Sequence, residues 1–177
     1  MSQMTPLWRA FEDNEITHSG AHYLLAIASF AKSGAPPRAA AVARRLGVSR
    51  AAVSLQLRTL QEHGLVALDD RQRLVLTDAG ADLVARVASK HDVLLVFLHE
   101  LLGVRAPTAE LDACKVEHLL SEESAAALVR LLRFARSEEP EAQAFLSAFR
   151  RTTAHCRPGA RCELCTEACL LAAGGSA

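Results

Sequence analysis

Cys114, Glu117 and His118 are the residues of this sequence best suited to bind a metal. They lie in the run Cys-Lys-Val-Glu-His, at positions i, i+3 and i+4, which share one face of an α-helix. A thiolate, a carboxylate and an imidazole suit Fe(II), Mn(II) or Zn(II) better than Ca(II) or Mg(II). Three side chains from one helix rarely complete a coordination shell. His22 and His91 are further candidates, because an unpaired imidazole among apolar neighbours is costly. By spacing alone, ordinary surface residues remain an open alternative.

A second group of potential ligands lies near the end of the chain, where four cysteines fall within fourteen residues with the spacing C-x5-C-x2-C-x3-C. These are Cys156, Cys162, Cys165 and Cys169. Structural zinc sites usually use two C-x2-C pairs, and this segment has one. A short loop that supplies four thiolates is also compatible with an iron-sulfur cluster. We expect a cluster here, with structural zinc and a thiol switch or disordered tail as alternatives.

Composition predicts a mainly α-helical, cytosolic protein. Half of the 177 residues are hydrophobic but only 5% are aromatic, which favours helices packed through small aliphatic side chains. No apolar run approaches the roughly 20 residues of a membrane span, and the first residues do not resemble a signal peptide. In a reducing compartment, clustered cysteines indicate metal or redox chemistry before structural disulfides.

The first half of the sequence predicts a winged helix-turn-helix. Helices are expected over residues 19–33, 38–46 and 50–63, with Gly47 in the turn and Ser49 as the N-cap of the third helix. Short β-prone runs at 65–68 and 74–76 then flank a charged turn, which forms the wing.

The second half predicts more helices. Thr77 caps a long helix that reaches about Leu102, and further helices are expected over 107–120, 121–136 and 140–151. The expected organisation is an N-terminal arm (1–15), a DNA-binding domain (16–80), a helical dimerisation and metal-binding domain (78–151), and a cysteine-rich tail (152–177).

Charge supports a local DNA-binding surface. The chain has 20 basic and 20 acidic residues, so non-specific attraction to phosphate cannot come from net charge. Residues 38–73, however, hold seven arginines against three acids. In a winged helix-turn-helix the second helix of the motif enters the major groove and the wing reaches the backbone or minor groove. The residues expected to face DNA are Arg38, Ser49, Arg50, Ser54, Gln56, Arg58, Arg71 and Arg73.

Taken in order, these elements closely resemble the diphtheria toxin repressor family of iron- and manganese-dependent regulators. The similarity runs without gaps from about Tyr23 to Arg136. Its characteristic stretches are Ala43-Arg-Arg-Leu-Gly-Val-Ser-Arg-Ala-Ala-Val-Ser, Glu62-His-Gly-Leu-Val, Leu76-Thr-Asp-Ala-Gly80, Lys90-His91 and Cys114-Lys-Val-Glu-His-Leu-Leu-Ser-Glu-Glu.

The resemblance implies roles for particular residues. It assigns Cys114, Glu117 and His118 to the regulatory metal site and His91 to a neighbouring site. His22 falls where the iron regulators have Met and the manganese regulators Asp, and imidazole there favours Fe(II), Zn(II) or Co(II) over Mn(II).

The sequence departs from the family pattern at two ligand positions and at its end. Leu95 replaces an acidic residue, and Glu110 stands where a His is expected, so Glu110 is a substitute ligand. The cysteine-rich tail stands in place of the SH3-like domain that iron regulators often add.

The sequence therefore predicts a metal-dependent, iron-responsive transcriptional regulator that binds palindromic double-stranded DNA as a homodimer. The alternative is a winged-helix sensor of oxidants or soft metals that acts through its tail cysteines. A small metalloenzyme is a third reading, disfavoured because no nucleophile or oxyanion motif accompanies the ligands; we expect no enzymatic activity.

Overall fold

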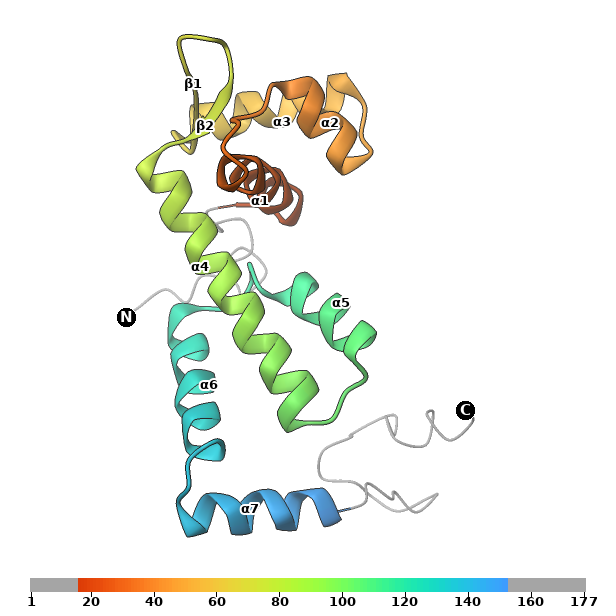
Figure 1. Ribbon diagram of the computed structural model, residues 1–177, viewed down its shortest axis with the longest axis vertical. Helices are drawn as coiled ribbons and strands as arrows, with labels where there is room; N and C mark the ends of the chain where they lie inside the picture. Colours follow the sequence, from red (N-terminus) through yellow and green to blue (C-terminus); the bar gives the residue numbers. More distant parts are fainter. Residues whose placement is uncertain (1–15, 153–177) are drawn as a thin grey trace, which may run out of the picture. The chain divides into compact units, whose positions relative to one another are not determined.

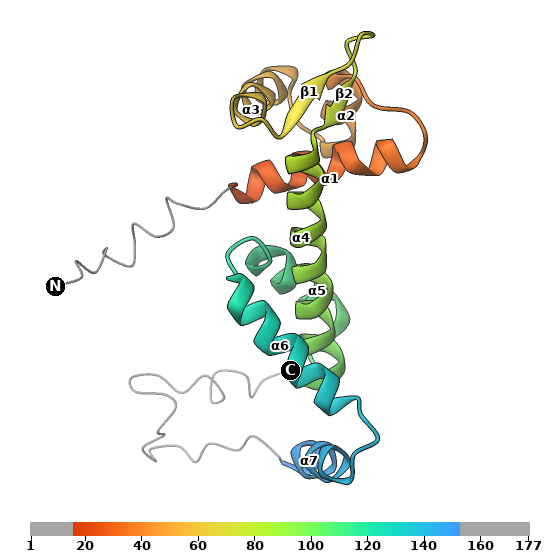
Figure 2. The ribbon, with the colours of Figure 1, turned by 90° about the vertical axis from the view of Figure 1, so that its left-hand side faces the viewer.

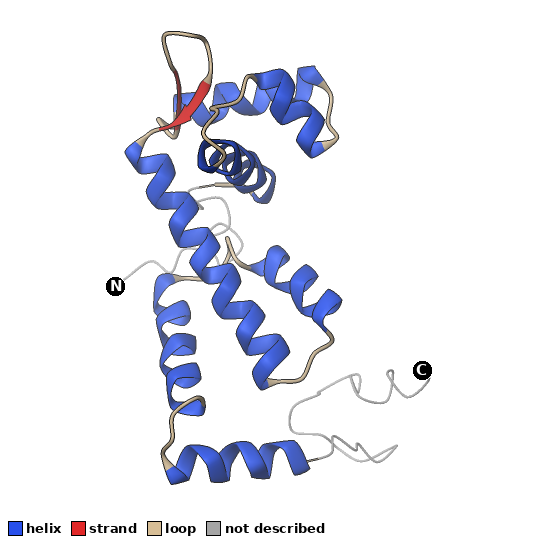
Figure 3. Ribbon diagram, in the orientation of Figure 1, coloured by secondary structure: helices blue, strands red, loops and turns tan. Residues whose placement is uncertain are grey.

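The computed structural model describes residues 16–152, and within them the protein is mainly helical, as the sequence predicts (Figures 1 and 3). The tail cysteines and the N-terminal arm lie outside the described residues. The first three helices are α1 (His18–Lys32), α2 (Ala39–Leu46) and α3 (Arg50–Glu62).

Local capping fixes where these helices begin and end. The Ser49 side chain accepts a hydrogen bond from the backbone N–H of Ala52 at 3.1 Å and so begins α3. Gly47 ends α2 in the left-handed region, with φ of 67°. The turn between α2 and α3 is therefore encoded by adjacent residues, as the sequence predicts.

The wing is a two-stranded antiparallel hairpin, β1 (Val66–Leu68) and β2 (Leu74–Leu76), with Val66 opposite Leu76. Figure 2 shows the hairpin projecting beyond the helices. Its turn is organised by Asp69, whose carboxylate accepts hydrogen bonds from the backbone N–H groups of Arg71 and Arg73. Asp69 also forms an ion pair of 2.6 Å with the Arg73 guanidinium.

The core of the winged helix-turn-helix module is built around α1, which packs against α2, α3, β2 and the following long helix. Leu24 and Ile27 of α1 are fully buried there, together with Val42, Val53 and Leu60. Because α1 shares one apolar core with α3, a displacement of α1 is transmitted to α3 through close packing.

The long helix α4 (Asp78–Leu95) leaves the wing and continues as a π-helical stretch, η2 (Val96–Leu101), before Gly103 ends it with φ of 75°. The sequence predicts an uninterrupted helix to about Leu102. The wider π winding is a difference in backbone hydrogen bonding that side-chain periodicity does not report.

Helix α5 (Ala106–Val116) lies beside α4 (Figures 1 and 2), and α6 (Glu122–Ala135) follows it. The sequence predicts that the α5 helix extends to about Leu120. It ends instead at Val116, where Glu117 donates its N–H to Ala113 and Leu119 donates to Val116 in a tight turn. Cys114 therefore lies in the last turn of α5, whereas His118 lies beyond the helix.

Residues up to Leu132 form one compact unit, and the residues from Arg133 onward form another, which contains α7 (Pro140–Arg151). In α7, the rings of Phe145 and Phe149 stack with their centroids 6.3 Å apart. Among residues 16–152, no helix has both the length and the apolar character needed to cross a membrane.

Gly80 provides a test of how α4 is anchored to the wing. Its N–H donates to Thr77 Oγ1 at 3.1 Å, and a Cβ at this position would collide with the backbone carbonyl of Leu65, whose carbon lies 2.9 Å away. We expect Gly80→Ala to destabilise the protein by about 2 kcal/mol, because backbone cannot move aside as a side chain does. Denaturant unfolding measures this change.

Gly20 is the matched control, because its N–H donates to Thr17 Oγ1 at 3.1 Å in the same helix position. A Cβ on Gly20 would approach Ile16 Cγ1, at 2.7 Å, which belongs to a side chain that can rotate. Gly20→Ala is expected to cost less than Gly80→Ala. Equal losses of stability would contradict the role of the Leu65 carbonyl.

Candidate metal centre

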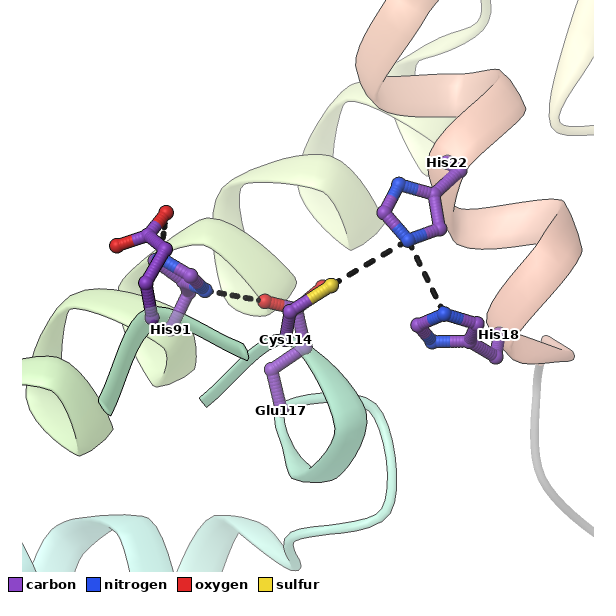
Figure 4. A network of polar contacts seen from close by, with 6 residues as sticks. His18, His22, His91, Cys114 and Glu117 are labelled. Carbon is purple, nitrogen blue, oxygen red and sulfur yellow. Dashed lines mark hydrogen bonds and ion pairs between the residues drawn. The ribbon is translucent and has the colours of Figure 1, made fainter. Parts of the chain in front are cut away.

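Three potential metal ligands converge where α1 approaches α5. Cys114 Sγ lies 3.4 Å from His22 Nε2, and His22 Nε2 lies 3.1 Å from His18 Nε2 (Figure 4). Ligand atoms of the three residues all lie within 4.8 Å of one another. The structure thus brings His22 and Cys114 together and adds His18, which sequence reasoning missed.

His18 carried a detectable signal in the sequence. It precedes His22 by four residues, so both imidazoles lie on the same face of an amphipathic helix. The resemblance assigns its first ligand position to His22, four residues later, so no family position pointed to His18.

His118 lies next to this cluster. Its ring centroid is 4.9 Å from that of His18. Within the described residues its Nδ1 is buried and has no hydrogen-bond partner. Such an orphaned nitrogen is costly to bury, and coordination of a cation is one way to satisfy it.

A second group forms around His91 of α4. His91 Nδ1 lies 2.7 Å from Glu117 Oε2, and His91 Nε2 lies 3.3 Å from Glu110 Oε1. Figure 4 shows His91 on the far side of Glu117 from the α1 histidines. Glu110, expected as a substitute ligand, thus reaches His91, while Leu95 contributes no donor.

Glu117 connects the two groups. Its side chain is only 3% exposed. Burial raises the pKa of its carboxyl group, and the hydrogen bond and positive charge of His91 partly oppose that rise. Cys114 and Glu117 thus share one turn of backbone but turn toward different histidines.

The electrostatics of the cluster favour neutral ligands before a cation binds. Burial, followed by the nearby His18, lowers the pKa of His22. Burial, followed by His18 and His22, lowers the pKa of His118. Burial raises the pKa of the Cys114 thiol, and the carboxylates of Glu117 and Glu110 raise it further. The imidazoles are therefore ready to coordinate, whereas the thiol must lose a proton first.

Six of the eight residues expected to face DNA are exposed. Four of these lie on α3 and its N-cap, namely Ser49, Arg50, Ser54 and Arg58. The other two are Arg38, before α2, and Arg71, in the turn of the wing. Gln56 is instead half-buried, with its Nε2 3.3 Å from the place of a Cβ on Gly20 of α1. Arg73 is engaged by Asp69, which leaves its guanidinium less free to reach phosphate.

Leu55 is a feature of this surface that sequence reasoning did not include. It is 68% exposed in the middle of α3, between the outward-facing Ser54 and the half-buried Gln56. An apolar side chain in that position can contact the methyl group of thymine in the major groove.

Comparison with known proteins identifies both halves of this arrangement. Residues 21–70 match the IclR helix-turn-helix domain, and residues 77–143 match the domain described as iron dependent repressor, metal binding and dimerisation. Of the candidate ligands, His22 lies in the first matched domain and Cys114 in the second. Fold and site together define a winged helix-turn-helix regulator with a metal-binding domain.

Individual relatives agree with this class. An HTH-type transcriptional regulator of Methanocaldococcus jannaschii is 32% identical over 102 residues, which are 57% of this chain and 82% of that protein. The diphtheria toxin repressor of Corynebacterium diphtheriae is 30% identical over 63% of this chain and 49% of its own length. The metal-dependent transcriptional regulator MtsR is 28% identical in sequence. Its crystal structure matches this fold with a TM-score of 0.60, over 67% of this chain and 55% of that one.

The chain belongs to the diphtheria toxin repressor family of metal-dependent transcriptional regulators. The predicted family and fold class are thereby confirmed. The chain spans about half the length of the diphtheria toxin repressor itself.

Metal affinity at this cluster is expected to rise with pH. Because the Cys114 thiol is protonated at neutral pH and must bind as thiolate, one proton leaves on coordination, and affinity increases about tenfold per pH unit below the thiol pKa. Chelator competition with Zn(II) at several pH values measures this slope. It is best done in a tail-serine background, the full-length chain carrying Cys156→Ser, Cys162→Ser, Cys165→Ser and Cys169→Ser.

Cys114→Ser in the same background is the control. It removes the thiol proton, so the pH dependence above the ordinary histidine range should flatten. A slope that is unchanged by Cys114→Ser would show that another group supplies the proton.

Proposed function

We propose that this chain is a repressor whose affinity for DNA is raised by a divalent transition metal bound between α1 and α5. The observation that carries the proposal is the 3.4 Å approach of Cys114 Sγ to His22 Nε2, which joins residues 92 positions apart. One donor belongs to the DNA-binding module and the other to the metal-binding domain.

The donors around this contact fit a transition metal. Thiolate and imidazole nitrogen are ligands that Fe(II), Co(II) and Zn(II) accept, whereas Mn(II) prefers oxygen. His22, Cys114 and His118 would hold the cation, with Glu117 beside them and His91 and Glu110 forming the neighbouring group. A bound cation supplies a cross-link between α1 and α5. We propose Fe(II) as the physiological ion.

The consequence for DNA binding follows from the position of α1. Because α1 and α3 share one apolar core, an arrangement that fixes α1 against α5 also fixes the orientation of α3. A metal that binds this arrangement better than the alternatives shifts the population toward it by its difference in affinity.

We further propose that the regulator acts in the cytoplasm as an isologous homodimer on a palindromic operator, and that it is not an enzyme. Two-fold symmetry presents two copies of α3 to successive major grooves. Arg50, Ser54 and Arg58 would lie along each groove, with Leu55 among them.

The proposal predicts that Cys114→Ala abolishes the effect of metal on DNA affinity. Allosteric coupling between two sites is typically about 5- to 150-fold, and a gain of that size should vanish because the cross-link is lost. DNA binding is measured by fluorescence anisotropy on operator DNA, with Fe(II) under anaerobic conditions and with chelator.

Arg50→Ala is the contrasting variant. It should weaken binding in both conditions and leave the ratio between them intact, because Arg50 faces DNA and not the metal. Retention of full metal stimulation by Cys114→Ala would refute the proposed function.

A second proposal concerns the tail, which lies outside the described residues, and it is supported by cysteine spacing alone. We propose that Cys156, Cys162, Cys165 and Cys169 hold an iron-sulfur cluster, since one short segment offers four thiolates. The protein would then respond to iron through cluster occupancy as well as through the α1–α5 site.

The cluster predicts iron and acid-labile sulfide in protein prepared anaerobically, with a broad visible absorption band. The tail-serine background should lose both and keep its fold, as judged by circular dichroism. Zinc without sulfide would identify a structural zinc site instead, and neither metal would favour the thiol-sensor alternative.

A further inference from the structure

His18 and His22 form a pair of imidazoles at the start of α1 that face the same point as Cys114. His18 is the first residue of the helix and is exposed, while His22 and Cys114 are half-buried. Residues four apart on a helix stack on one face, so the backbone of α1 itself holds the two rings together. Their rings meet edge to face, with centroids 4.5 Å apart.

The spacing of the donor atoms matches a shared ion. Bond lengths of about 2.0–2.1 Å to nitrogen and about 2.3 Å to sulfur place two ligands of a tetrahedral ion roughly 3.3 to 3.6 Å apart. The observed separations are 3.1 Å between the two Nε2 atoms and 3.4 Å between His22 Nε2 and Cys114 Sγ. All three donor atoms lie within 4.8 Å of one another, so side-chain rotations would suffice to bring them round one ion.

Hydrogen bonds among His18, His22 and Cys114 explain the close approach of their side chains less well than a shared cation does. A neutral imidazole nitrogen carries either one proton or one lone pair in the plane of its ring. His22 Nε2 nevertheless has two neighbours, His18 Nε2 and Cys114 Sγ, at hydrogen-bonding distance. A cation between the three atoms would satisfy all of them at once.

The resemblance to the family assigns one ligand in α1, at His22, and says nothing of His18. We propose that His18 is a metal ligand, so that α1 contributes two imidazoles to a site completed by Cys114 and His118. This assignment rests on the proposed function and makes it more specific. The nearby orphaned Nδ1 of His118 supplies a third nitrogen donor, which is the fourth ligand of the set.

The added imidazole determines which metals the site accepts. Three nitrogens and one thiolate form a tetrahedral set that suits Zn(II), Co(II) and Fe(II). Mn(II) favours carboxylate and water oxygen in an octahedral arrangement. His18 is therefore a residue that selects against Mn(II), in a family that includes both iron and manganese regulators.

The test compares Co(II) and Mn(II) binding by full-length protein in the tail-serine background, with and without His18→Gln. Glutamine keeps the length and polarity of the side chain, and the exposure of His18 makes a folding defect unexpected. Co(II) reports through its ligand-field bands and its thiolate charge-transfer band, and affinities come from chelator competition. His63→Gln, at an exposed histidine that ends α3, is the matched control.

His18→Gln should weaken Co(II) binding by at least about tenfold, since even loss of an outer-shell partner commonly costs that much. It should also alter the ligand-field bands, keep the charge-transfer band of Cys114, and change Mn(II) affinity much less. Co(II) affinity and spectrum equal to those of His63→Gln would overturn the assignment of His18. An equal loss for Mn(II) would overturn its role in selection.

Two further measurements distinguish a failure of the His18 assignment from a failure of the proposed function. Cys114→Ser should remove the charge-transfer band, and if it does not, the proposed function fails together with the role of His18. If Cys114→Ser removes the band but His18→Gln changes nothing, only the role of His18 fails. In the chain without a substitution at His18, long-range 1H–15N spectra should show the His18 Nε2 resonance shift when Zn(II) binds.

Discussion

The approach of Cys114 to His22 is the contact on which the proposed response to metal depends. It connects α1, at the centre of the DNA-binding core, with α5, which packs beside α4. A neutral imidazole and a protonated thiol form only a weak hydrogen bond, so the contact stabilises little by itself. Its significance lies in joining two domains through atoms whose interaction strengthens greatly when they share a cation.

Helix α1 serves two purposes with its two faces. One face buries Leu24 and Ile27 in the core that α1 shares with α3. The other carries the histidines that face α5. Because both faces belong to a single helix of 15 residues, a change on the metal-facing side reaches the DNA-binding side without an intervening hinge. The proposed coupling therefore runs through the packing of α1 against α3.

Much of the fold was predictable because its signals are local. Ser49, Thr77 and Gly47 cap helices through neighbouring backbone groups, and those signals predicted the start of α3, the start of α4 and the end of α2. The π-helical end of α4 was not predictable, because side-chain pattern does not distinguish the two windings. The candidate site was only partly predictable. Its helix-borne donors could be listed, but the partnership of His18 with Cys114 depends on how two distant helices approach.

The ion pair between Asp69 and Arg73 limits how strongly the wing can attract DNA phosphate. With Arg73 held by Asp69, the wing presents fewer free positive charges than its arginines suggest. Each phosphate contact adds about 0.9 to the dependence of log affinity on log salt concentration, so an arginine held by Asp69 contributes less to this term than a free one. With α3 in the major groove as proposed, its contacts with bases would then carry a larger share of the affinity than the phosphate contacts of the wing.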